Sequence, residues 1–276
     1  MPFIDIIIPT HNRATLLKRA IDSVLNQSFS DFHLIVVDDG STDHTQEILG
    51  EYQQHSQVTL LEKLNSGVSS ARNFGVAHSS ASWIAFLDSD DEWLPLKLQK
   101  AVDFIKVHPS IEFIHTDETW IRNGVRVNPP LKYKKDQENL FERSLEFCII
   151  SPSTSLMTRA LFDKYGPFNE SYPVCEDYDL WNKILAFDNI GYLPDQLTKK
   201  YGGHEDQLST RYVAMDYWRF CSLCELYSDP RLTSIQREQI RTALIVKADF
   251  LKKGLTKYPD PGRLEEINFK LSNLLK

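Results

Sequence analysis

The sequence has no long hydrophobic run, and this absence argues against a membrane-spanning segment. No apolar stretch approaches the roughly 18 residues that are needed to cross a bilayer. The first residues, MPFIDIIIPTHNR, lack a basic region, and Asp5 interrupts their apolar run, which is unlike a signal peptide. We therefore expect a cytoplasmic protein, with peripheral contact at the inner face of the membrane left open.

The sequence has few cysteines, and it lacks the glycine-rich motifs of several nucleotide-binding enzymes. Four cysteines in 276 residues do not make a disulfide scaffold, and no second Cys or His pair joins Cys221 and Cys224 to complete a zinc site. GxGxxG does not follow the first apolar run, which excludes a dinucleotide-binding dehydrogenase. GxxxxGK[ST] is absent, which excludes a P-loop enzyme. The glycine-rich first loop of sugar-phosphate nucleotidyltransferases is absent too.

An excess of positive charge is missing as well. The net charge of -7 argues against nucleic acid as a partner. Residues 211–276 differ from the rest, because they carry 12 Lys plus Arg and 8 Asp plus Glu. This mildly basic tail could favour an anionic membrane surface, or it could be the solvated face of helices.

Short apolar runs alternate with helical patterns over residues 1–116. The expected strands are 4–8, 34–37, 58–61, 83–87 and 113–115. Helices are expected over 13–26, from a cap at Ser41 or Thr42 to about 52, around 71–73, and over 95–108. This alternation predicts an α/β fold with βαβ units, a mostly parallel sheet and flanking helices. In such sheets ligands lie beyond the carboxyl ends of the strands.

The remainder of the chain is less regular at first and then helical. One helix is expected around 138–147, and three more over 215–228, 233–253 and 263–275. We predict a catalytic domain over 1–212, made of a nucleotide-binding half (1–116) and an acceptor half (117–212). Residues 213–276 would form a C-terminal α-helical extension.

Polar turns follow three of the predicted strands, in PTHN (9–12), DDGS (38–41) and DSDD (88–91). Carboxylates gathered at one edge of a sheet would repel each other unless a cation or hydrogen-bond donors lay between them. Asp88 and Asp90 are two residues apart, and their oxygens suit Mg²⁺ or Mn²⁺. The alternative is an acidic turn that caps the helix after Pro95.

The segments IIIPTHNR, VVDDGSTD, NSGVSSARNFG and FLDSDD, in this order over residues 3–94, resemble the N-terminal half of the family 2 glycosyltransferases. The resemblance continues more thinly to Glu176-Asp177 and His204. It implies the Rossmann-like GT-A fold and inverting transfer of a sugar from a nucleotide diphosphate.

The same resemblance implies roles for the first two turns. Pro9, Thr10 and Asn12 would line the nucleotide pocket, and Asp38 would accept a hydrogen bond from the base. A carboxylate accepts from an N–H and offers nothing to an acceptor, which favours a UDP- or dTDP-sugar over an ADP-sugar.

Further roles follow in the third turn and its neighbours. Arg72 would reach the base or the phosphates, although it could equally pair with a strand-end aspartate. Asp88 and Ser89 would belong to the nucleotide site, with Asp88 facing the ribose or a metal-bound water. Asp90 would bind the metal, Mn²⁺ or Mg²⁺, and His204 would join it as a ligand.

Glu176 and Asp177 precede an apolar helix, in PVCEDYDLW. The resemblance implies that Asp177 is the general base that acts on the acceptor hydroxyl, and that Glu176 shapes the acceptor pocket. The simpler alternative is that Asp177 or Asp179 only caps the helix.

The sequence therefore predicts a metal-dependent inverting glycosyltransferase in polysaccharide or glycoconjugate synthesis. The acceptor could be a glycan, a lipid-linked glycan or a protein, and the helical extension could form a homodimer or contact a membrane. The alternative is a non-catalytic module of the same fold that binds nucleotide sugars or a partner protein.

Overall fold

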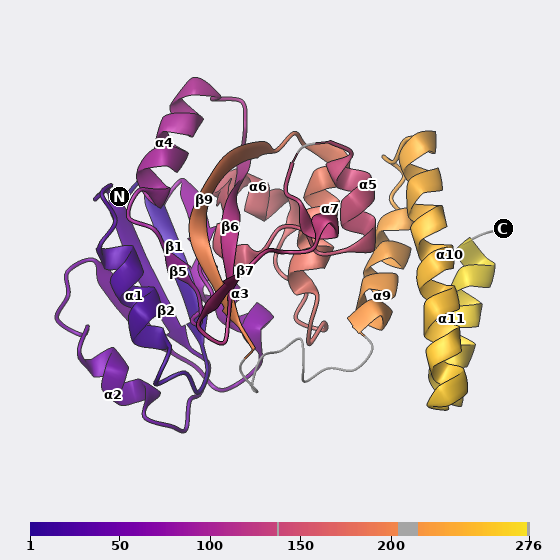
Figure 1. The fold of residues 1–276 in the computed structure, drawn as a ribbon, viewed down its shortest axis with the longest axis horizontal. Coiled ribbons are helices and arrows are strands. Elements are labelled where there is room, and N and C mark those ends of the chain that lie inside the picture. The colour runs from indigo at the N-terminus through magenta and orange to yellow at the C-terminus, as the bar shows by residue number, and fades with distance from the viewer. Residues whose placement is uncertain (137, 204–214, 275–276) are drawn as a thin grey trace.

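The computed structural model describes residues 1–136, 138–203 and 215–274, and one sheet is built from strands between residues 4 and 202 (Figure 1). Its strands are β1 (Ile4–Thr10), β2 (Phe32–Asp38), β3 (Val58–Glu62), β4 (Trp83–Phe86), β5 (Glu92–Trp93), β6 (Phe113–Arg122), β7 (Val125–Val127), β8 (Ser155–Thr158) and β9 (Gly191–Gly202). The strand order is β3-β2-β1-β4-β8-β6-β9-β5, and β7 pairs with β6.

The helices cover the sheet and extend beyond it. They are α1 (Leu17–Leu25), α2 (Thr45–Gly50), α3 (Val68–Ala77), α4 (Lys97–Val107), α5 (Leu140–Glu146), α6 (Arg159–Tyr165), α7 (Glu176–Phe187), α9 (Met215–Tyr227), α10 (Ser234–Lys257) and α11 (Pro261–Leu274). Two short 3₁₀ helices, η1 (Leu131–Tyr133) and η2 (Pro152–Thr154), lie between them. The cap predicted at Ser41 or Thr42 is wrong, because α2 begins at Thr45 after His44.

The first four strands are parallel, as the alternating pattern predicts. Their side chains alternate between two buried faces: Ile6 packs on the side of α1 and α4, whereas Ile7 packs on the side of α3. Close contact of α3 with β1 depends on Gly75. A Cβ atom there would lie 2.6 Å from Cγ2 of Ile7.

The second half of the sheet is mixed. β8 lies between β4 and β6 and is antiparallel to both, while β9 runs parallel to β6. The predicted fifth strand is therefore not a direct neighbour of β4. The predicted division at 116 and 117 falls inside β6. The boundary at 212 lies outside the described residues.

The helical extension packs on α5 and α7 through both α9 and α10. Its core side chains, such as Phe220 and Leu244, belong to one cluster with Leu145 of α5 and Tyr178 of α7. In Figure 1 the orange and yellow helices α9 to α11 stand at the opposite end of the molecule from α1 and α2. Across the described ranges, no helix combines the length and the apolar character that crossing a bilayer requires.

Candidate functional site

The three polar turns lie at one edge of the sheet, because β1, β2 and β4 are parallel neighbours. The amide of Asp39 donates to the carbonyl of Thr10 over 2.8 Å, which joins the ends of β1 and β2. The amide of Leu87 donates to the carbonyl of Ile7 over 3.0 Å, which does the same for β4. Pro9 and Thr10 are buried at this edge.

Asn12 holds the first turn against the second. Its backbone is left-handed (φ 53°), a conformation that asparagine tolerates well. Its side-chain oxygen accepts hydrogen bonds from the amides of Thr42 (2.8 Å) and Asp43 (3.3 Å). The hydroxyl of Ser41 accepts from the Asn12 amide over 2.8 Å. Asn12 is thus a structural link between two turns as well as a candidate for the nucleotide pocket.

Asp38 is completely buried. Its Oδ1 accepts from the amide (3.0 Å) and the hydroxyl (2.5 Å) of Ser41, and its Oδ2 accepts from the side chain of Gln46. Ser41 therefore orients Asp38 and does not cap a helix. Gln46, an exposed residue of α2, therefore already occupies Oδ2 of Asp38.

Asp39 is a structural member of the site that the sequence reasoning missed. Its Oδ1 accepts from Nζ of Lys63 (2.7 Å) and the amide of Ser66 (3.0 Å), and its Oδ2 accepts from the amide of Gly67 (2.8 Å). These bonds fasten the start of α3 to the end of β2, and so they fix the helix that carries Arg72. The adjacent carboxylates in DDG were the only signal.

Asp88, Asp90 and Asp91 form an acidic cluster, with one oxygen from each within 4.8 Å of the others. Burial, followed by the charges of Asp90 and Asp88, raises the pKa of Asp91 well above its usual value. Its oxygens accept from the hydroxyl of Ser153 (2.6 Å) and the amide of Tyr201 (2.9 Å). Asp91 thus has a structural role, whereas Asp88 and Asp90 are partly exposed.

The alternative that the acidic turn caps α4 is wrong. The cap residue of α4 is Leu96, and no side chain caps the helix. Ser89 is buried within the turn. His204, the other predicted metal ligand, lies outside the described residues. Oxygen atoms from Asp88 and Asp90 are the hard donors that Mg²⁺ and Mn²⁺ prefer, so these residues fit such an ion.

Arg72 joins the acidic turn to the start of α7. Its Nη2 lies 2.7 Å from Oδ1 of Asp88, and its Nη1 contacts Oε1 of Glu176. Burial alone would lower the pKa of Arg72, but Asp88 and Glu176 outweigh burial and raise it. The ion pair with a strand-end aspartate, predicted as one use of Arg72, is therefore present.

Glu176 and Asp177 open α7 and have different surroundings. Burial raises the pKa of Glu176 to about 7, with Arg72 opposing this effect and Asp177 adding to it. Asp177 is partly exposed; its Oδ1 accepts from the amide of Tyr178 (2.7 Å) and its Oδ2 accepts from Sγ of Cys148 (3.3 Å).

The helix-capping alternative for these aspartates is wrong. The cap residue of α7 is Cys175, and no side chain caps the helix. Asp179 is buried and binds Lys183 of the same helix (2.6 Å) and the hydroxyl of Ser222 in α9 (2.8 Å). Among the described hydrogen bonds, Oδ2 of Asp177 therefore accepts only from the thiol of Cys148.

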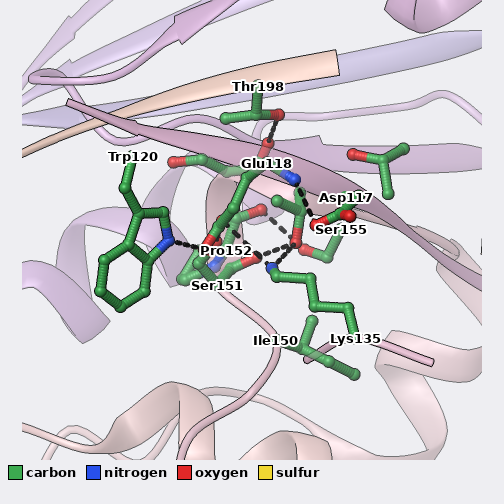
Figure 2. Close-up of polar contacts among 12 residues, drawn as sticks. Asp117, Glu118, Trp120, Lys135, Ile150, Ser151, Pro152, Ser155 and Thr198 are labelled. Carbon is green, nitrogen blue, oxygen red and sulfur yellow. Dashed lines mark hydrogen bonds and ion pairs between the residues drawn. The ribbon is translucent and has the colours of Figure 1, made fainter. Parts of the chain in front are cut away.

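A buried ion pair beside the site also escaped the sequence reasoning. Oε2 of Glu118 lies 3.1 Å from Nζ of Lys135 and accepts from the hydroxyl of Ser151 (2.6 Å), while Oε1 accepts from Nε1 of Trp120 (2.7 Å) (Figure 2). Lys135 is buried, although most of the other residues in 128–136 and 138–139 are exposed. The pair therefore anchors this segment to β6.

Glu118 is also linked electrostatically to the acidic cluster. Burial by itself raises the pKa of Glu118, but Lys135 and Lys200, with the bonds from Ser151 and Trp120, lower it to about 2. Burial lowers the pKa of Lys200, and Glu118 and then Asp91 outweigh this and raise it. The charge of Lys200 on β9 thus acts on both groups of carboxylates.

The Glu118 pair predicts a specific loss of stability in acid. Because the pKa of Glu118 is lower in the folded chain than its ordinary 4.5, its contribution is present at neutral pH and is lost as the pH falls toward 2. Between pH 6 and pH 3 the wild type should lose about 2 kcal/mol more unfolding free energy than Glu118→Gln. Urea titrations followed by tryptophan fluorescence measure this difference.

The exposed Glu138 supplies the matched control for that experiment. Glu138→Gln should follow the wild-type dependence on pH. An identical dependence in wild type and Glu118→Gln would show that Glu118 is not held as an ion pair.

Comparison with known proteins is decisive for the family. Residues 5–166, more than half of the chain, match the Glycosyl transferase family 2. The chain belongs to this family. Its fold agrees with solved structures of S. aureus TarS 1-349 in complex with UDP-GlcNAc (TM-score 0.73, 21% identity, 99% of this chain and 79% of that chain). A Pyrobaculum calidifontis mannosyltransferase, PcManGT, in complex with GDP-Man and Mn²⁺, has a TM-score of 0.63 at 16% identity, over 99% of this chain and 85% of that chain.

Relatives of this family 2 chain include an Escherichia coli protein named UDP-Glc:alpha-D-GlcNAc-diphosphoundecaprenol beta-1,3-glucosyltransferase WfgD. It is 31% identical over 68% of this chain and 71% of its own length. Uncharacterized glycosyltransferases of Rickettsia are similar as well. The one from Rickettsia bellii is 33% identical over 71% of this chain, and the match spans 28% of that protein. The one from Rickettsia typhi is 30% identical over 75% of this chain, and the match spans 65% of that protein.

Proposed function

We propose that the chain is an inverting glycosyltransferase that moves a sugar from a UDP-sugar to a hydroxyl of a lipid-linked sugar diphosphate. Membership of family 2 supports the reaction class. The reaction in the name of the Escherichia coli relative supports the UDP donor and the lipid-linked acceptor, which here would serve polysaccharide or glycoconjugate synthesis. dTDP remains a second candidate nucleotide, because Asp38 suits the N3–H of uracil and of thymine equally.

The observation that carries this proposal is the double contact of Arg72. One guanidinium binds Asp88 of the turn proposed to face the donor and Glu176 beside the proposed base. The donor diphosphate and the acceptor hydroxyl would consequently meet within reach of one rigid element. Bringing two reactants together in this way removes much of the entropic barrier to their reaction.

Asp177 would act as the general base. In-line attack at the anomeric carbon needs a carboxylate within hydrogen-bond reach of the acceptor hydroxyl, on the face opposite the diphosphate. Oδ2 would take the proton, since Oδ1 is held by the amide of Tyr178. Burial, and then Asp177 itself, raises the pKa of the Cys148 thiol, so the thiol stays protonated and can donate to Oδ2 until the acceptor arrives. Glu176 would keep Arg72 in place.

Asp88 and Asp90 would hold a divalent cation, Mg²⁺ or Mn²⁺, together with the diphosphate oxygens of the donor. Such an ion neutralises charge on a departing diphosphate. His204 remains a proposed ligand. Dimer formation through α9–α11, and contact of these helices with a membrane at the cytoplasmic face, also remain predictions.

A thermal-shift experiment tests the donor and the metal together. UDP and dTDP with Mn²⁺ should raise the melting temperature, by roughly 6 °C at a concentration of about one hundred times Kd, and GDP and ADP should do so less. Asp90→Asn should abolish the dependence on metal, whereas Asp103→Asn, an exposed aspartate on α4, should not. Equal stabilisation by every nucleotide with and without metal would contradict the proposal.

A further inference from the structure

The helical extension brings two cations to the acceptor side of the site. Arg219 of α9 lies 3.1 Å from Oδ1 of Asp216, and Lys247 of α10 lies 3.3 Å from the same oxygen. These are the only salt bridges that the described residues form with either cation. Two positively charged side chains thus share one carboxylate.

These cations lie beside the proposed base. The guanidinium carbon of Arg219 and Nζ of Lys247 are each 5.9 Å from the ring centre of Tyr178, the residue after Asp177. α9 is fixed against α7 at this point, because Ser222 donates to Asp179 over 2.8 Å.

Two thiols near Asp177 are also within the electrostatic influence of Arg219. Cys148 donates to Asp177, and Cys175 precedes it by two residues. Burial raises the pKa of both thiols, and for both of them Arg219 is a cation that opposes the shift. The charge of Arg219 therefore acts on the two thiols that lie near Asp177.

Arg219 is also under-used as a hydrogen-bond donor. Its Nε is buried and has no hydrogen-bond partner among the described residues. Lys247 is more fully occupied, because it donates to the carbonyl of Glu146 over 2.9 Å in addition to its ion pair. Arg219 is consequently the better placed of the two to receive an anionic ligand, and a guanidinium suits phosphate oxygens.

We propose that Arg219, supplied by the helical extension, binds the phosphate attached to the acceptor sugar. The inference rests on the proposed function, which gives the acceptor a diphosphate on the same ring that carries the attacked hydroxyl. With that hydroxyl at Asp177, the phosphate would lie about one sugar ring away, and Arg219 of α9 is the cation that would meet it. The extension is thereby part of the acceptor site.

The test compares two synthetic acceptors that differ only in the phosphate. One is GlcNAc joined by an α-diphosphate to a phenoxyundecyl chain, and the other is GlcNAc joined directly to that chain. Arg219→Met should lower kcat/KM for the diphosphate acceptor by about 10- to 100-fold, and for the neutral acceptor by less than threefold. Arg219→Lys should fall between, because it keeps the charge and loses the planar fork.

Two controls separate this inference from folding and from the proposed function. Arg219→Met leaves Asp216 paired with Lys247, so the variant should fold; Arg241→Met, in the same extension, should behave as wild type. Calorimetric binding of phenoxyundecyl diphosphate, with saturating UDP and Mg²⁺ to block the donor site, needs no turnover. An unchanged Kd in Arg219→Met, or an equal loss with both acceptors, overturns the inference. Failure of wild type to transfer to either acceptor, with that diphosphate still bound through Arg219, would overturn the proposed function instead.

Discussion

Asp177→Asn should reduce kcat for sugar transfer by about 1,000-fold while leaving the KM for the donor almost unchanged. The amide cannot take a proton from the acceptor hydroxyl, but its oxygen can still accept from the amide of Tyr178 as Oδ1 does now. The start of α7 should therefore keep its conformation. Steady-state kinetics with separate variation of donor and acceptor measure both constants.

Asp188→Asn is the matched control, because Asp188 lies at the other end of the same helix and pairs with Lys164. It should alter stability slightly and kcat by less than twofold. Full transfer activity in Asp177→Asn would remove Asp177 from the role of base. A wild type that binds UDP and transfers no sugar to any acceptor would favour the non-catalytic module.

Arg72→Met should be the most damaging substitution for both folding and activity. It leaves buried Glu176 without its cation, and breaking a buried ion pair in this way costs about 3–5 kcal/mol. It also releases Asp88 from the acceptor half, and a misplacement of reacting groups by about 1 Å can cost 100-fold in rate. Urea unfolding and transfer kinetics measure the two losses.

The destabilisation by Arg72→Met should depend on pH in a direction that identifies Glu176. Burial already raises the pKa of Glu176 in the presence of Arg72, and without that cation the pKa rises further. The folded variant then binds a proton that the unfolded chain releases above its ordinary pKa of 4.5, so stability falls as pH rises from about 5 to 8. Near pH 5, protonation of Glu176 removes the negative charge that Arg72 no longer balances.

Arg159→Met provides the comparison. Arg159 joins α6 to the end of α3 by donating to the carbonyls of Val76 and Ser79, and none of its described bonds goes to a carboxylate. The Arg159→Met variant should lose about 1 kcal/mol of unfolding free energy, and this loss should not change between about pH 5 and 8. Arg72→Lys should recover part of the loss, because an ammonium can satisfy one carboxylate and lacks the fork that reaches both. Wild-type stability and activity in Arg72→Met would show that the bridge does not hold the site.

The candidate site was predictable where its residues follow directly on strands. Asp38, Asp88 and Asp90 stand at the ends of apolar runs, and parallel strands bring those ends to one edge. Lys135 gave no such signal, because it lies in a polar segment and only the folded chain buries it against Glu118. Local patterns also misled at Ser41, where a hydroxyl suited to a helix cap instead binds Asp38.

The sequence by itself determined the family, the parallel first half of the sheet and the identity of the turns, because each of these depends on short-range patterns of apolar and polar residues. Only the tertiary structure decided that β8 separates β4 from β6, that Arg72 joins Asp88 to Glu176, and that Ser222 of α9 bonds Asp179 of α7. These relations connect residues more than 40 positions apart in most cases. They arise from packing between elements, which a pattern within one element does not encode.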